Sequence, residues 1–255
     1  MTSPLFDLSG RTALVTGASQ GIGLAIAEGL AAAGAALILN GRSPAKLEAA
    51  AEGLRAHGAI VAIAAFDVTD GAAARKAVDA AEGAGTAIDI LVNNAGVQRR
   101  GALETFDHDD WRDLMRTNVD AVFYVGQAVA RHMIARGRGK IINIASVQTE
   151  LARATIAPYT ASKGAVRNLT RGMCADWAKF GLQINAIAPG YFATSLNRAL
   201  WEDPEFDAWL KARTPTGRWG RLEDLHGAAV FLASTASDFV NGQTLFVDGG
   251  VTAVI

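Results

Sequence analysis

The chain alternates short aliphatic runs with longer alanine-rich segments whose apolar positions recur every three or four residues. Continuous aliphatic runs are typical of strands buried on both faces, and a period near 3.6 is typical of helices. The predicted strands are Thr12–Thr16, Ala36–Asn40, Ile60–Phe66, Ile88–Asn93, Lys140–Ala145, Leu182–Ile187 and Thr244–Val247. The predicted helices are Gly21–Ala33, Ser43–His57, Asp70–Ala84, Asp107–Arg136, Tyr159–Phe180 and Leu222–Ser234.

This alternation predicts βαβ units, and therefore an α/β protein with a parallel sheet covered by helices on both faces. No Pro-, Gly- or Ser-rich linker interrupts it, so residues 1–255 are predicted to form a single domain. Residues 191–221 break the rhythm and carry Trp201, Trp209 and Trp219. Ligands of open α/β sheets bind beyond the carboxyl ends of the strands, so this segment is predicted to be a flap over the substrate. A structural or oligomer-facing flap is the alternative.

Composition narrows the class of protein. Half of the 255 residues are hydrophobic and 19% are charged, which excludes a disordered chain. A net charge of −1 without a basic stripe argues against a nucleic-acid partner. Cys174 is the only cysteine, which fits a reducing, cytoplasmic location. No signal peptide is expected, because Met1–Asp7 has neither a basic region nor a long apolar region. No membrane span is expected, because the longest apolar stretch covers only about 11 residues. The histidines have no metal-ligand spacing, so no metal site is expected.

A glycine-rich segment, TGASQGIG, follows the first predicted strand at Thr16–Gly23. Glycine permits a tight turn and close backbone approach to a pyrophosphate, and the next helix offers free N–H groups at the positive end of its dipole. The segment is therefore predicted to bind a dinucleotide, with a turn that merely packs helix on sheet as the alternative. The predicted contacts are Gly17, Ser19, Gln20, Gly21, Ile22 and Gly23.

The end of the second predicted strand indicates which dinucleotide is bound. Cofactor sites for NAD usually place an acid there, whereas this chain has Asn40-Gly41-Arg42. A guanidinium pairs well with a 2′-phosphate, so Arg42 predicts NADP(H), and Ser43 adds a hydroxyl contact or only a helix cap. Asp67 is expected to accept a bond from the adenine amino group. Small residues and amides after the fourth strand are expected to line the cofactor: Asn94, Ala95 and Gly96.

Tyr159 and Lys163 are four residues apart in YTASK, so their side chains share one helix face. A free tyrosine has a pKa near 10, and an ammonium about 5 Å away would lower it by about two units. That would make Tyr159 an effective acid or base near neutral pH. Ser146, directly after a predicted strand, and Asn118, in the preceding long helix, strengthen the interpretation of this spacing as an active site.

These residues together resemble the classical short-chain dehydrogenase/reductase family over the full chain. The matching motifs are TGASQGIG, Asp67-Val68, NNAG, Asn118, Ser146, YTASK, Pro189-Gly190 with Thr194, and Asp248-Gly249-Gly250. The resemblance implies a Rossmann-type, doubly wound sheet of seven parallel strands, and a homotetramer. It also implies a catalytic tetrad with Tyr159 as acid/base, Lys163 lowering its pKa and binding the nicotinamide ribose, Ser146 holding the substrate oxygen and Asn118 supporting a water. Val68, Pro189, Gly190 and Thr194 would contact the cofactor.

Further stretches resemble the gluconate 5-dehydrogenases, also called 5-keto-D-gluconate 5-reductases, within this family. They are VNNAGVQRR, GQAVARHM, ELARATIAPYTASKGAV, APGYFAT and ASDFVNG. The resemblance implies a sugar-acid substrate, and an arginine beyond the fourth strand would suit its carboxylate. The candidate substrate contacts are Arg100, Gln148, Glu150, Arg153 and Tyr191, with surface charges or subunit contacts as the alternative. Trp201 and Trp209 would close over the sugar or pack within the flap.

Another sugar or polyol reductase of the same family stays open at this point, and so do two further functions. One is a 3-oxoacyl carrier-protein reductase of the same family, which would need a basic docking face that the sequence does not display near its last helices. The other is a non-catalytic NADP-binding sensor, which would need the glycine-rich loop but not the pair formed by Tyr159 and Lys163.

Overall fold

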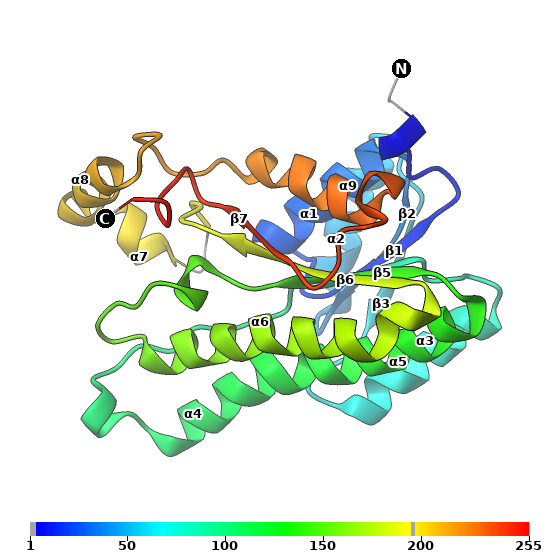
Figure 1. The fold of residues 1–255 in the computed structure, drawn as a ribbon, viewed down its shortest axis with the longest axis horizontal. Helices are drawn as coiled ribbons and strands as arrows, with labels where there is room; N and C mark the ends of the chain where they lie inside the picture. Colours follow the sequence, from blue (N-terminus) through cyan, green and yellow to red (C-terminus); the bar gives the residue numbers. More distant parts are fainter. Residues whose placement is uncertain (1–3, 195–196, 255) are drawn as a thin grey trace.

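The computed structural model describes residues 4–194 and 197–254, and within them seven strands form one parallel sheet. The strand order is β3-β2-β1-β4-β5-β6-β7 (Figure 1), which confirms the predicted Rossmann-type fold class. The strands are β1 (Thr12–Val15), β2 (Ala36–Gly41), β3 (Val61–Ala65), β4 (Ile90–Asn93), β5 (Gly139–Ile144), β6 (Leu182–Pro189) and β7 (Thr244–Val247).

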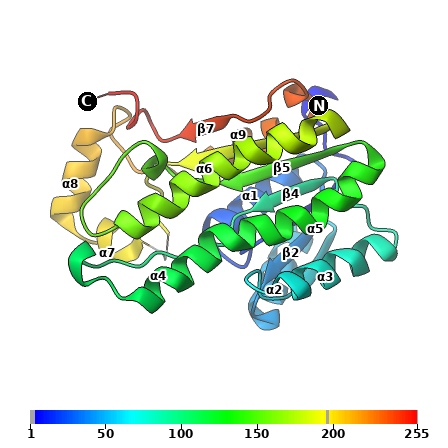
Figure 2. The same cartoon turned by 60° about the horizontal axis from the view of Figure 1, so that its bottom comes forward.

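Helices cover both faces of the sheet (Figures 1 and 2). One layer contains α1 (Gly21–Ala32), α2 (Pro44–Arg55) and α9 (His226–Ala233). The other contains α3 (Gly71–Gly83), α5 (Ala121–Arg136) and α6 (Ala157–Trp177). The shorter α4 (His108–Met115), α7 (Arg198–Trp201) and α8 (Pro204–Arg213) lie at one end of the molecule. None of the helices in the described ranges has the length and apolar character needed to cross a bilayer.

Burial explains why the aliphatic runs form central strands. All six residues of β5 are buried, and β4 is buried throughout, because helices pack against both faces. The two hydrophobic clusters lie on opposite sides of the sheet, with Leu14 and Ile141 in one and Val15 and Ile142 in the other. Alternate residues of each strand therefore serve alternate layers.

Side-chain caps begin α2 and α3, and the cap at Ser43 is one of the two roles predicted for that residue. The Ser43 hydroxyl accepts a hydrogen bond from the Lys46 amide at 3.4 Å, and Pro44 occupies the first turn of α2. Asp70 caps α3 by accepting from the amides of Ala72 and Ala73, each at 3.0 Å. The helix boundaries that these caps define lie within two residues of the predicted ones.

Beyond small shifts of element boundaries, the structure differs from the prediction in three places. The first turn of the predicted helix Leu222–Ser234 is a 3₁₀ helix, Leu222–Leu225, which precedes α9. The segment predicted as one helix, Asp107–Arg136, contains a π-helical turn at Arg116–Asp120 between α4 and α5. The predicted flap, residues 191–221, contains α7 and α8, which the rhythm of apolar residues did not predict. Asp203 caps α8, and Pro204 starts it, so the local signal for that helix was present in the sequence. Residues 195–196 of the flap lie outside the described part of the chain.

Candidate active site

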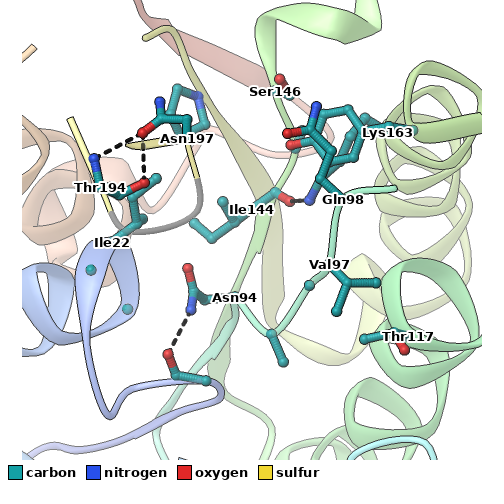
Figure 3. Close-up of a pocket in the computed structure, with 18 of the residues that line it drawn as sticks. Ile22, Asn94, Val97, Gln98, Thr117, Ile144, Ser146, Lys163, Thr194 and Asn197 are labelled. Atoms are coloured by element: carbon teal, nitrogen blue, oxygen red, sulfur yellow. Dashed lines mark hydrogen bonds between the residues drawn. The ribbon is translucent and has the colours of Figure 1, made fainter. Parts of the chain in front are cut away.

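A cleft of about 750 Å³ opens at the carboxyl ends of the strands. Its walls come from the loops that follow β1 to β6 and from the start of the flap, so residues far apart in the sequence meet there. Figure 3 shows Thr194 and Asn197 on one side of this cleft and Ser146 and Lys163 on the other, with Asn94 and Ile144 between them.

The glycine-rich loop has the shape of a phosphate cradle. Gly17 and Gly21 have φ angles of +62° and +60°, which favour glycine. A Cβ at Gly17 would lie 2.9 Å from Ala95 Cα, whereas one at Gly21 would point into the open cleft, 4.0 Å from Thr194 Cγ2. The N-cap residue of α1, Gln20, makes no side-chain capping bond, so the helix start keeps its N–H groups available to an anion. These features fit the pyrophosphate of a dinucleotide.

Asn94 fastens this loop to the end of β4. Its Nδ2 donates to the Thr16 carbonyl at 2.9 Å and to the Gly17 carbonyl at 3.1 Å. The Thr16 hydroxyl in turn accepts from the Asn94 amide at 2.9 Å and the Ala95 amide at 3.1 Å. The position of the cradle relative to the neighbouring strand is therefore set by hydrogen bonds at both strand ends.

Nearly all of the predicted cofactor contacts line the same cleft. They are Gly17, Ser19, Gln20, Gly21, Ile22, Gly23, Arg42, Asp67, Val68, Asn94, Ala95, Gly96, Tyr159, Lys163, Pro189, Gly190 and Thr194. Ser43 does not line it, because its hydroxyl caps α2. The Thr194 hydroxyl donates to Asn197 Oδ1 at 3.0 Å, a partner that the sequence motifs did not suggest.

Tyr159 and Lys163 lie on one face of α6, as their spacing predicted, and face the cleft together with Ser146. Lys163 is 5% exposed, and its Nζ donates to the carbonyl of Ile144 at 2.7 Å. Nζ is 5.7 Å from the centre of the Tyr159 ring. The Ser146 hydroxyl accepts from the Gln148 amide at 3.2 Å, which fixes its position at the end of β5.

The expected lowering of the Tyr159 pKa by Lys163 is not found. Burial raises the pKa of Tyr159 to about 12, with the Ser146 hydroxyl acting in the opposite direction and Tyr191 adding to the rise. Burial also lowers the pKa of Lys163 to about 8. The physical reason is that both groups share a poorly solvated site, which penalises each charged form, and that the ammonium bonds a carbonyl rather than the phenol.

Asn118 lies behind the wall of the cleft rather than in it. It is 1% exposed, and its Oδ1 accepts from the Val97 amide at 2.8 Å while its Nδ2 donates to the Val97 carbonyl at 2.9 Å. Nδ2 also donates to the Ser162 hydroxyl at 3.1 Å, and that hydroxyl donates to the Tyr159 carbonyl at 2.7 Å. Ser162 thus links Asn118 to the backbone of Tyr159.

Sequence reasoning missed Ser162, although it lies within the YTASK motif. The signal available was a small hydroxyl residue between Tyr159 and Lys163 on a helix, at a position that faces inward.

Two arginines, Arg100 and Arg153, line the cleft beside Tyr191. Partial burial and the charge of Arg153 lower the pKa of Arg100, while Tyr191 has the opposite effect. The Arg153 guanidinium stacks over the Phe206 ring at 5.1 Å, and its buried Nε has no hydrogen-bond partner among the described residues. Two neighbouring guanidinium groups repel each other, so an anion between them would be stabilised.

Gln148 and Glu150 differ in their surroundings. Gln148 is 6% exposed, lines the cleft, and leaves its buried Oε1 without a partner among the described residues. Glu150 lies outside the cleft, because its carboxylate pairs with Arg167 on α6. This geometry does not support the predicted substrate contact at Glu150.

The tryptophans of the flap do not line the cleft either. Trp209 is half-exposed and stacks on Phe206, with ring centres 5.2 Å apart. Trp201 donates from its indole to the Thr194 carbonyl at 3.1 Å. Their contacts favour packing within the flap over the predicted closure on a sugar. Across residues 4–194 and 197–254, no group of His, Cys, Asp and Glu side chains is arranged to hold a metal ion.

Comparison with known proteins agrees with this geometry. The family model for short chain dehydrogenases matches residues 11–205. The chain therefore belongs to the short-chain dehydrogenase family. Its Rossmann-type sheet and the cleft at the strand ends are those of an oxidoreductase of this family.

Relatives within the family are similar over the full length. The gluconate 5-dehydrogenase of Gluconobacter oxydans is 62% identical over 248 residues, which cover 97% of each chain. The 5-keto-D-gluconate 5-reductase of Escherichia coli K12 is 51% identical over 98% of this chain and 99% of its own. The crystal structure of a gluconate 5-dehydrogenase from Burkholderia cenocepacia in complex with NADP and tartrate has 61% identity and a TM-score of 0.97, covering 99% of each chain.

Proposed function

We propose that this protein is an NADP(H)-dependent oxidoreductase that interconverts D-gluconate and 5-keto-D-gluconate. The observation that carries the proposal is a single cleft that joins a dinucleotide cradle, the pair Tyr159 and Lys163, and the arginine pair Arg100 and Arg153. The identity of 62% with a gluconate 5-dehydrogenase over nearly the whole chain supports the same substrate.

The chain's residues fit NADP(H) along the whole cleft. The cradle at Gly17–Gly23 would receive the pyrophosphate, Arg42 the 2′-phosphate, and Asp67 the adenine amino group. Tyr159, Lys163, Pro189, Gly190 and Thr194, which line the same cleft, would contact the nicotinamide end. When bound, NADPH supplies a hydride and NADP⁺ accepts one.

The protein groups manage the proton. Because the pKa of Tyr159 is raised to about 12, its hydroxyl is protonated at neutral pH and can donate to the oxygen of a carbonyl substrate. The phenolate left behind would lie near the Lys163 Nζ, which is 5.7 Å from the centre of the Tyr159 ring. Ser146 would hold the substrate oxygen. In the oxidation the same phenolate would take up the proton of the C5 hydroxyl.

Substrate recognition would use the part of the cleft that Arg100, Arg153 and Tyr191 line. Arg100 and Arg153 would hold the carboxylate, and their mutual repulsion would be relieved by it. The unpartnered Oε1 of Gln148 would accept a hydrogen bond from a hydroxyl of the sugar acid. Tyr191 would lie beside this pair, since its ring packs on Phe206, over which the Arg153 guanidinium stacks, and both Tyr191 and Arg153 line the cleft.

Three wider features belong to the same proposal. Residues 1–255 act as one dinucleotide-binding and catalytic unit, with residues 191–221 as its substrate flap. The enzyme is a homotetramer, supported by the fully exposed Phe239 and by the exposed Leu245 on the edge strand β7. A cytoplasmic location is supported by the single, unpaired Cys174. Light scattering during gel filtration tests the tetramer.

The test of the proposed function is a matrix of initial rates. NADPH and NADH are each combined with 5-keto-D-gluconate, and acetoacetyl thioester and a neutral ketose serve as control substrates. The expected result is rapid turnover with NADPH and 5-keto-D-gluconate and little with NADH or the controls. Preference for the thioester would reject the sugar-acid substrate, and preference for NADH would reject the role of Arg42.

A further inference from the structure

Arg116 is a cation of the cleft for which the reaction has no role. It is the first residue of the π turn Arg116–Asp120, an irregularity of a kind that is frequent at functional sites. Its exposed side chain lines the cleft together with Arg42 and Asp67, which follow β2 and β3. The turn therefore brings a second arginine to the adenosine end from the opposite layer of helices.

The neighbouring cation Arg99 is already neutralised. Its guanidinium pairs with Asp110 at 3.3 Å and with Asp113 at 3.0 Å. Arg116 and Arg42 have no carboxylate within 4.0 Å among the described residues. Their charges are available to a ligand, whereas the charge of Arg99 is not.

Asp67 makes one arginine insufficient for a phosphate at this end. Hydrogen bonds from the Thr69 amide and hydroxyl, followed by the charges of Arg42 and Arg116, lower the pKa of Asp67, while burial acts in the opposite direction. The carboxylate is therefore ionised at neutral pH and repels a second anion nearby. One arginine only cancels Asp67, whereas two leave a net positive charge that can attract a phosphate.

We propose that Arg116 is a specificity-determining residue that holds the adenosine 2′-phosphate of NADP(H) from the side opposite Arg42. The inference rests on the proposed use of NADP(H). It predicts that discrimination between NADP(H) and NAD(H) comes from two arginines on different structural elements, one after β2 and one at the end of α4.

Titration calorimetry with two cofactor fragments tests this role without turnover. Adenosine 2′,5′-bisphosphate carries the 2′-phosphate, and adenosine 5′-monophosphate lacks it. The variants are Arg116→Ala, Arg116→Lys and, as a matched control, Arg112→Ala. Arg112 lies one turn earlier on the same helix, is largely exposed, pairs with Asp109 at 2.8 Å and does not line the cleft.

Arg116→Ala is expected to weaken the bisphosphate about tenfold, which corresponds to about 1.4 kcal/mol, and the monophosphate less than about twofold. Arg116→Lys should recover part of the loss, because the charge stays while the bidentate geometry is lost. Arg112→Ala should change neither. Since screening weakens exposed charge pairs, the difference between Arg116→Ala and wild type should shrink in high salt.

Each other outcome contradicts the inference. Equal weakening of both fragments would assign Arg116 to the adenine ring, and no weakening would assign it to the surface. Failure of the wild type to bind the bisphosphate would reject the use of NADP(H), and the role of Arg116 with it. Failure of the Arg116 proposal alone would leave wild-type binding of the bisphosphate intact. Thermal melting of each variant confirms that the exposed substitution leaves the fold intact.

Discussion

The hydroxyl of Ser162 is predicted to hold the catalytic tyrosine in place, and Ser162→Ala removes it. The side chain is fully buried, accepts from Asn118 Nδ2 at 3.1 Å and donates to the Tyr159 carbonyl at 2.7 Å. After substitution, Nδ2 keeps its bond to the Val97 carbonyl but loses its second partner. A buried polar group left unpaired costs about 1–3 kcal/mol, so we expect a loss of about 2 kcal/mol in the free energy of unfolding.

The substitution Ser162→Ala should therefore change two measured quantities, the melting temperature and kcat. For a chain of this size, about 2 kcal/mol lowers the Tm by roughly 4–8 °C. Because small displacements of a catalytic group cost large factors in rate, we expect kcat to fall about tenfold or more. NADPH affinity should change less than about twofold, because Ser162 does not line the cleft. The assay combines thermal unfolding, NADPH titration and initial rates.

Ser237→Ala is the matched control for this prediction. Ser237 is also fully buried and lies away from the cleft. Its hydroxyl donates to the carbonyls of Leu232 at 3.2 Å and Ser234 at 3.1 Å, and accepts from Lys140 Nζ at 3.3 Å. It should lower the Tm by a similar amount and leave kcat unchanged. A Ser162→Ala enzyme with wild-type kcat, or an equal loss of kcat in Ser237→Ala, would refute the positioning role.

Three further predictions concern the substrate end, the buried lysine and the cradle. Arg153→Ala should raise KM for 5-keto-D-gluconate at least about tenfold with little change in kcat. Glu150→Ala, a substitution outside the cleft, should alter neither constant. Equal effects of the two substitutions would contradict the proposal that Arg153 holds the carboxylate of the substrate. Burial lowers the pKa of Lys163 from 10.5 to about 8. Between these two pH values the unfolded chain binds more protons than the folded one, so the free energy of unfolding rises with pH. The rise is roughly 2 kcal/mol between pH 8 and pH 10. Denaturant unfolding of Lys163→Met should lack this rise, and parallel pH curves for the two proteins would argue against a desolvated ammonium. Gly23→Ala should abolish NADPH binding measured by fluorescence, because its Cβ would overlap Asn94 Nδ2 and the Gly17 carbonyl; retained affinity would contradict the tight cradle.

The sheet was predictable because each strand is marked by a short aliphatic run in its own sequence. A run such as Lys140–Ala145 is aliphatic on both faces, and β5 is indeed buried along its whole length. Boundaries shifted by one or two residues, since strand ends depend on pairing with neighbours. The π turn at Arg116–Asp120 was not predicted; within it Asn118 bonds Val97, 21 residues away, and local periodicity does not reveal such a contact.

The site was predictable where function requires a local motif. The glycine cradle and the four-residue spacing of Tyr159 and Lys163 each lie within one segment, and both face the cleft. Glu150 was misjudged because its partner Arg167 lies on another element. The pKa of Tyr159 was predicted in the wrong direction because spacing reveals the nearby ammonium but not the degree of burial.

The central claim is that Tyr159 supplies the proton for NADPH-dependent reduction of 5-keto-D-gluconate. Its most direct test is single-turnover NADPH oxidation by the wild type and Tyr159→Phe, each with NADPH binding measured by calorimetry. The phenylalanine variant is expected to bind NADPH within about threefold of the wild type and to react at least about 100-fold more slowly. Near-normal reaction in Tyr159→Phe would contradict the account.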